Sequence, residues 1–170
     1  MTLIICGLSE VPRLIEARRP SHLVTLLDPA SMIDTPAGVG AERHLRLAVN
    51  DIVVPTEGLV APTARLVEDL LAFGADWDET APMLIHCWAG ISRSTACAFI
   101  LACERSPDAD ERAIALAMRQ AAPHAFPNRR IVALADDMMN RRGRMLDAVE
   151  AMGTSTVVFG NPFDFAVRHR

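Results

Sequence analysis

The sequence predicts a three-layer α/β fold, in which a mainly parallel central sheet carries helices on both faces. Short apolar runs alternate along the chain with longer segments of helical periodicity. One run, Met83-Leu84-Ile85, is apolar at consecutive positions, which is typical of a strand buried on both faces. Glycine or proline stands at many of the junctions between segments. Strands that alternate with helices favour parallel pairing, because the helices supply the crossover connections.

The elements follow from these signals in chain order. Four strands are predicted, at residues 3–6, 23–27, 44–49 and 83–87. A first helix should begin after a capping Ser9 and stop before Pro20, and a second should run from about Pro62 to Gly74. Three more helices are predicted from the loop after residue 87 to about residue 105, over 108–121 and over 128–152. The tail, residues 154–170, has one candidate strand at 157–159.

Length and composition indicate a soluble enzyme of one domain, residues 1–170. A chain of 170 residues can bury a sizeable core, and 51% hydrophobic with 22% charged residues is unlike a disordered protein. The net charge of −4 gives no electrostatic reason to expect nucleic acid or an anionic membrane as a partner. All 17 basic residues are arginine, which together with abundant alanine suggests GC-rich coding and a bacterial source.

The four cysteines form no C-x-x-C pair and no cluster with histidine, so neither a disulfide framework nor a metal site is expected, and no cofactor is predicted. The N-terminus lacks the basic region of a signal peptide, and no apolar run is as long as a membrane span. A nucleophilic thiol also needs a reducing compartment, so we expect a cytoplasmic protein. Three of the cysteines are expected to be small buried hydrophobic residues: Cys6, Cys97 and Cys103.

The fourth cysteine, Cys87, stands where the 83–87 strand meets a short loop that opens a helix. Such a loop binds anions, because its N–H groups converge and the helix N-terminus adds partial positive charge. A cysteine in this setting should ionise readily, since the thiolate is itself an anion. Arg93, six residues later, offers a planar fork of donors suited to two phosphate oxygens. The loop therefore predicts a nucleophile placed beside a phosphate site.

The arrangement His86-Cys87, five residues, Arg93-Ser94, with Gly90 inside the loop, resembles the signature of the cysteine-dependent protein tyrosine phosphatase superfamily and is closest to its dual-specificity branch. The resemblance implies a four- to five-stranded sheet and hydrolysis of phosphomonoesters through a cysteinyl phosphate, without a metal. The substrate would be a phosphorylated protein, most simply one carrying phosphotyrosine. The backbone of the loop would bind phosphate, through Trp88, Ala89, Gly90, Ile91, Ser92 and Arg93.

Three further residues receive supporting roles. His86 should point away from the site, because neighbouring residues on a strand face opposite ways, and the resemblance implies that it shapes the loop. The resemblance also implies that the Ser94 hydroxyl bonds the cysteine sulfur and helps it leave. Asn128, in a Pro-Asn pair before the last helix, could brace the catalytic loop as in relatives or only cap its helix.

The general acid should be a carboxyl at the sheet edge that holds Cys87. Asp51 follows the third strand at this edge, and Val49-Asn50-Asp51 resembles the general-acid motif of dual-specificity phosphatases. Asp28, at the equivalent place after the second strand, is the rival, and either residue could instead cap a turn. The carboxyls at 76, 78 and 79 precede the central strand and should lie roughly 15 Å from the cysteine.

Several functions remain open. Phosphoinositide-directed relatives carry basic residues inside the loop, whereas its variable positions here are Trp88, Ala89 and Ile91, which favours a protein over a phosphoinositide or a small phosphate ester. A rhodanese-like sulfurtransferase also uses a loop cysteine, and a non-catalytic phosphate-binding module is the third class. The arginines of the 128–152 segment are expected on a solvated helix face.

Overall fold

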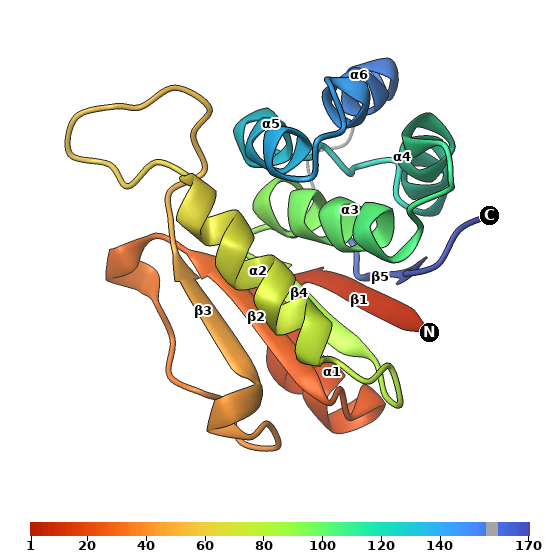
Figure 1. Cartoon of the computed structure of the whole chain (residues 1–170). Helices are drawn as coiled ribbons and strands as arrows, with labels where there is room; N and C mark the ends of the chain where they lie inside the picture. Colours follow the sequence, from red (N-terminus) through yellow and green to blue (C-terminus); the bar gives the residue numbers. More distant parts are fainter. Residues whose placement is uncertain (156–159) are drawn as a thin grey trace.

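The computed structural model describes residues 1–155 and 160–170, and it contains a five-stranded sheet (Figure 1). The strands lie in the order β3-β2-β4-β1-β5. The first four in the chain are parallel to one another, and the last pairs antiparallel with β1. Their bounds are β1 Thr2–Gly7, β2 His22–Leu27, β3 His44–Ala48, β4 Met83–Cys87 and β5 Phe163–Ala166. The predicted mainly parallel sheet is confirmed.

Strand β4 is the middle strand, and every residue in it is buried. It lies between β1 and β2, in a register that sets Gly7 opposite Cys87 and Thr25 opposite His86. Because these strands are parallel, their carboxyl ends meet at one edge of the sheet, where Cys87 ends β4. Ligands of open α/β sheets bind beyond this edge.

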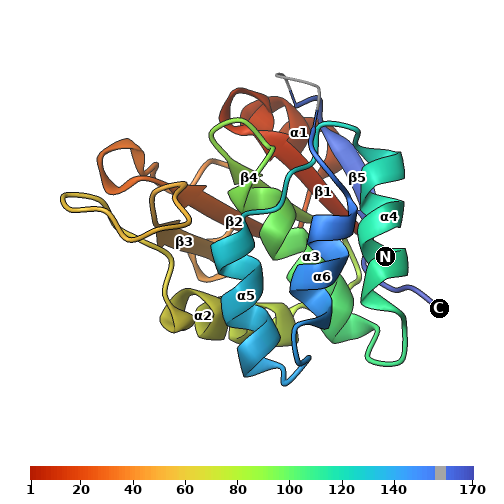
Figure 2. The same cartoon turned by 90° about the horizontal axis from the view of Figure 1, so that it is seen from above.

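The helices form the outer layers. Helix α1 (Val11–Arg18) alone covers one face, where it packs on Ile4, Leu23 and Leu84. The other five cover the opposite face (Figures 1 and 2). They are α2 (Ala64–Asp76), α3 (Arg93–Arg105), α4 (Glu111–Ala121), α5 (Arg129–Met138) and α6 (Arg144–Ala151). Helix α3 runs through the main core, which explains why its first eleven residues are all buried. The three-layer prediction is confirmed.

Two helix starts differ from the prediction. Ser9 does not cap α1, because a 3-10 turn at Leu8–Glu10 precedes the helix and Glu10 occupies the cap position without a side-chain bond. Helix α2 begins at Ala64, two residues after Pro62. Both differences concern the exact turn at which a helix starts, where weak local preferences compete.

The single helix predicted over 128–152 is wrong, because the chain breaks into α5 and α6. Asn140, Arg142 and Gly143 adopt positive φ between the two helices, which ends the helical path. The carboxylate of Asp136 then accepts hydrogen bonds from the N–H groups of Gly143 and Met145, so it caps the start of α6. The break lets α6 turn back to pack on both α4 and α5.

This break also corrects the prediction of a solvated arginine face at one residue, Arg141, whereas Arg129, Arg142 and Arg144 are exposed as predicted. Arg141 is buried, and its guanidinium donates to Glu111 at 3.0 Å and to the carbonyls of Pro107 and Cys103. Arg144 reaches the same carboxylate from a more exposed position. Arg141 and Glu111 thus form a buried ion pair that joins the α5–α6 turn to α4.

Glu111→Gln should therefore destabilise the fold. The substitution keeps the shape of the side chain but leaves the Arg141 charge buried without its counter-charge, so we expect a loss of about 3 kcal/mol in the free energy of unfolding. Urea denaturation followed by circular dichroism measures it. As a control, Glu42→Gln removes a carboxylate whose pair with Arg43 is exposed, and should change stability by less than about 0.5 kcal/mol. Equal losses in the two variants would contradict the role of the buried pair.

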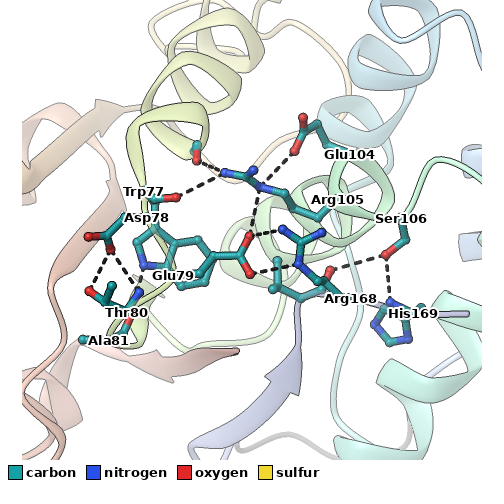
Figure 3. A network of polar contacts seen from close by, with 12 residues as sticks. Trp77, Asp78, Glu79, Thr80, Ala81, Glu104, Arg105, Ser106, Arg168 and His169 are labelled. Atoms are coloured by element: carbon teal, nitrogen blue, oxygen red, sulfur yellow. Dashed lines mark hydrogen bonds and ion pairs between the residues drawn. The ribbon is translucent and has the colours of Figure 1, made fainter.

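The C-terminal tail is secured at the end of the sheet opposite Cys87 (Figure 3). Arg168 donates two hydrogen bonds to Glu79, which also faces Arg105, and the N–H of His169 donates to Ser106. Strand β5, which precedes Arg168 and His169, was not predicted. The candidate strand at 157–159 lies outside the described residues. In the part of the chain that is described, no helix is long and apolar enough to cross a bilayer.

Candidate active site

The site is the loop between β4 and α3. Cys87 is the last residue of β4, its side chain is only 2% exposed, and it lies on the face that α3 covers. The Sγ atom is 3.2 Å from Oγ of Ser94, in the first turn of α3, so this hydroxyl can hydrogen-bond the sulfur. The thirteen-residue helix directs its N-terminus at the loop, which favours a negative charge there.

Gly90 allows the loop to sit on the end of β1. Its φ of +73° is in the left-handed region, and a Cβ atom would lie 2.6 Å from the carbonyl carbon of Cys6 and 2.7 Å from the nitrogen of Gly7. The N–H of Leu8 donates to the carbonyl of Trp88 at 3.1 Å, on the same side. A side chain at position 90 would therefore push the loop away from the strand that supports it.

The other side of the loop is held by the segment before α5. The N–H of Phe126 donates to the carbonyl of Ile91 at 2.8 Å, and that of Asn128 donates to the carbonyl of Ser92 at 3.2 Å. A planar trans peptide directs its N–H opposite to its carbonyl. Since these carbonyls are held from outside, the N–H groups of Ser92 and Arg93 point the other way, as a phosphate-binding loop requires.

Arg93 is buried beneath this loop and is incompletely paired. One terminal nitrogen donates to the carbonyl of Val49 at 2.8 Å, which orients the guanidinium. The Nε atom is buried and has no hydrogen-bond partner among the described residues. A buried charged donor without an acceptor is costly, so this atom marks a place where an anionic ligand would be stabilised.

His86 lies outside the reaction site, as predicted. Its ring is fully buried, with Nε2 2.7 Å from the hydroxyl of Thr25 and Nδ1 3.3 Å from the carbonyl oxygen of Cys87. Burial lowers the pKa of His86 to about 4, so the ring is neutral near pH 7. The residue holds the backbone of Cys87 and is not placed to act as a base.

Asp51 is brought to the loop, and its contacts are made through two other predicted residues. Its Oδ1 accepts from the hydroxyl of Ser92 at 2.7 Å and from the amide of Asn128 at 2.8 Å. The oxygen of the Asn128 side chain meanwhile accepts from the N–H groups of Arg130 and Ile131. Asn128 therefore both caps α5 and ties Asp51 to the loop, so the two interpretations of this residue hold together.

Asp28, the rival carboxyl, is engaged elsewhere. It precedes a 3-10 turn and accepts from the hydroxyl of Ser31 at 2.8 Å, a local turn contact. Within the described residues it makes no hydrogen bond or ion pair with the loop between β4 and α3. The carboxyls of Asp78 and Glu79 are likewise occupied by Thr80 and Arg168 at the opposite end of the sheet (Figure 3).

The remaining cysteines are buried and unpaired, as predicted. Cys6 lies on the α1 face of the sheet, whereas Cys87 lies on the opposite face. Burial raises the pKa of Cys6 and of Cys103 to about 12, and it also raises that of Cys97. These thiols are therefore protonated at neutral pH. Among the described residues, no cluster of three or more histidine, cysteine or carboxylate side chains could hold a metal ion.

An apolar rim of four residues flanks the loop, with Trp88 on the side of Gly7 and Ser9 and the other three on the side of Asp51 and Ser92. Trp88, Val53, Val54 and Phe126 are 59%, 53%, 67% and 44% exposed, which is unusual for large apolar residues. Three of them, all but Trp88, line a groove with a volume of about 670 Å³ that begins at Asp51 and Ser92. The sequence indicated the apolar loop positions, but it gave no sign that the 52–60 segment would stand beside them.

Comparison with known proteins found no matching family model and no matching curated protein. Among solved structures, the chain is similar to PTPMT1 in complex with PI(5)P, with a TM-score of 0.51 and 17% identity over 88% of this chain and 91% of that one. At this identity the similarity concerns the fold alone, and the chain shares a three-layer α/β fold with that structure.

Proposed function

We propose that this protein hydrolyses phosphomonoesters through a cysteinyl-phosphate intermediate. The observation that carries the proposal is the convergence of one buried thiol, one buried and incompletely paired arginine and a loop of N–H groups at the end of β4. These groups provide a nucleophile and a site for the charge of a phosphoryl group in the same place.

In the first step, the Cys87 thiolate attacks phosphorus, a sulfur–phosphorus bond forms, and the bond to the leaving oxygen breaks. The equatorial oxygens are held by the loop N–H groups and by Arg93, whose Nε then gains its acceptor. Asp51 donates its proton to the leaving oxygen. Both of the hydrogen bonds described above end on its Oδ1, so the proton is carried by Oδ2.

In the second step, water attacks the cysteinyl phosphate and Asp51 accepts a proton from it. The sulfur–phosphorus bond breaks, and inorganic phosphate leaves. The Ser94 hydroxyl, 3.2 Å from Sγ, donates to the departing thiolate and makes it a better leaving group. The enzyme returns to its starting state with its acid protonated again.

For the substrate, we propose a phosphorylated protein, with phosphotyrosine favoured over phosphoserine and phosphothreonine. The apolar rim supports this choice, because Trp88 and the Val53–Val54 pair offer surface to residues that flank a phosphorylated side chain. A phosphoinositide is the second candidate, since the solved structure of PTPMT1 contains PI(5)P. The loop has no basic residue at its variable positions, which argues against a highly charged inositol.

We also propose a cytoplasmic location, where the thiol stays reduced.

The test is hydrolysis of an aryl phosphate. We expect turnover of p-nitrophenyl phosphate that excess EDTA leaves unchanged, because Arg93 and the loop neutralise the charge, and that vanadate blocks by occupying the phosphate site. Loss of activity in EDTA would contradict the metal-independent route.

The other two classes predict different results. A sulfurtransferase would form thiocyanate from thiosulfate and cyanide, and a non-catalytic module would bind phosphate without turnover. Side-by-side assays on phosphopeptides, phosphoinositides and nucleotides then rank the substrates, with phosphotyrosyl peptides expected first.

A further inference from the structure

A chain of polar side chains, buried except for its half-buried first member, crosses three strands and ends on the backbone of the nucleophile. The hydroxyl of Thr35 lies 2.9 Å from Nδ1 of His44, whose Nε2 lies 2.8 Å from the hydroxyl of Thr25. That hydroxyl is in turn 2.7 Å from Nε2 of His86, and Nδ1 of His86 is 3.3 Å from the carbonyl oxygen of Cys87. The chain starts in the 29–42 loop and passes through β3, β2 and β4.

The direction of every hydrogen bond in this chain is fixed by its last member. The Cys87 carbonyl can only accept, so Nδ1 of His86 carries the proton, and Nε2 of the same neutral ring must accept. The Thr25 hydroxyl therefore donates to His86 and accepts from Nε2–H of His44. Nδ1 of His44 then accepts from the Thr35 hydroxyl. Each donor meets one acceptor, and the two histidines hold opposite tautomers.

The surroundings favour neutral rings in both positions. Thr25 and His86 are fully buried and stand opposite each other in the register of β2 and β4. Burial lowers the pKa of both His44 and His86 to about 4, and the positive charge of Arg46 acts in the same direction on His44. A neutral ring with one donor and one acceptor is the form that the chain requires.

We propose that Thr25 and His44 are positioning residues that fix the tautomer of His86 and, through it, the carbonyl of Cys87 and the loop that follows. Without the Thr25 hydroxyl, Nε2 of His86 would be buried with no donor and could take the proton instead. Nδ1 would then turn a lone pair toward the Cys87 carbonyl oxygen, and the first peptide of the loop would have to rotate. The positions of the loop N–H groups depend on that peptide.

The tautomers can be read directly in the intact protein. Long-range ¹H–¹⁵N correlation spectra of the histidine rings at pH 7 should show the Nδ1–H form for His86 and the Nε2–H form for His44. The variants His44→Gln and Thr25→Ser serve to assign the signals. The same tautomer in both rings, or a charged ring in either, would overturn the proposal.

The consequence for the nucleophile is measured by alkylation. The rate of carboxamidomethylation of Cys87 by iodoacetamide at pH 6, followed by mass spectrometry of its peptide, reports the reactive thiolate. We expect Thr25→Val, which has the same shape without the hydroxyl, to slow this reaction about tenfold. Thr25→Ser restores the hydroxyl and should recover most of the rate. Ser106→Ala removes a buried hydroxyl from the opposite end of α3 and should leave the rate unchanged.

An unchanged rate in Thr25→Val, or an equal loss in Ser106→Ala, would overturn the positioning role. If Thr25→Val does not fold, the tautomers of the native protein decide the question. The proposal rests on the proposed function, because that function makes Cys87 the nucleophile. The tautomer spectra and the alkylation rate nevertheless need no turnover of a substrate. If the protein shows the expected tautomers but no phosphatase activity, the proposed function is wrong and the hydrogen-bond chain from Thr35 to Cys87 still holds.

Discussion

Cys87→Ser is expected to reduce hydrolysis of p-nitrophenyl phosphate by at least about a thousandfold. Serine is similar in size and keeps its side chain beside Ser94, but a hydroxyl does not ionise near neutral pH. Neither the helix N-terminus nor Arg93 can compensate, since both stabilise an anion that serine does not form. The measurement is steady-state turnover, together with acid quenching of the native enzyme to trap the phosphorylated protein.

The matched control is Cys103→Ala. Cys103 is also a buried cysteine, but it lies near the far end of α3, and alanine suits a helix well. We expect its turnover to match that of the native protein. Activity in Cys87→Ser within a few-fold of the native enzyme, or a trapped phosphoryl group in that variant, would contradict cysteine as the nucleophile.

The four parallel strands could be predicted because their signals are local. Three of them are short apolar runs, the third strand shows partial alternation through Arg46, and each has a breaker or a polar residue at its end. Local signals do not give the order of the strands in the sheet. They also do not show that α1 covers a different face of the sheet from the other helices. The resemblance to a known superfamily implied only the number of strands and the packing of the later helices around the central strand, so the strand order and the place of α1 come from the structure.

The failures lie where distant contacts decide the structure. The break between α5 and α6 depends on Asp136 capping a turn seven residues ahead, within a segment whose composition favours one helix. Strand β5 is short, and its pairing with β1 joins the two ends of the chain. Arg141 looks like a surface arginine until Glu111, thirty residues earlier, is known to face it.

The site divides in the same way. Cys87, Arg93 and Ser94 belong to one local motif, and the structure brings them together. Asp51 could be reached by reasoning about sheet edges, although Asp28 fitted that argument too, and only the contacts to Ser92 and Asn128 distinguish the two. Thr25 and His44 were missed. The one available signal was that Thr25 is the only polar residue in the 23–27 run.

Asp51→Asn should slow hydrolysis of phenyl phosphate by about a hundredfold or more, and hydrolysis of p-nitrophenyl phosphate much less. The amide oxygen can still accept from Ser92 and Asn128, so the loop keeps its position, but the side chain has no proton to give. p-Nitrophenyl phosphate has a weakly basic leaving group that can depart without a proton, whereas the more basic phenoxide of phenyl phosphate needs one from the acid. The measurement is kcat/KM over a series of aryl phosphates, in which the loss should grow with the basicity of the leaving group.

Asp28→Ala is the comparison that decides the assignment. It removes a carboxyl at the same sheet edge whose hydrogen bond stays within its own turn, so we expect the dependence on the leaving group to match that of the native enzyme. If Asp28→Ala steepens this dependence and Asp51→Asn does not, the acid is Asp28. A uniform loss across the series in Asp51→Asn would instead assign Asp51 to holding the loop. The two carboxyls occupy equivalent places on neighbouring strands, so their positions do not show which one donates the proton. The dependence of kcat/KM on the basicity of the leaving group does, because only the loss of a proton donor steepens it, whereas the loss of a residue that holds the loop lowers every rate equally.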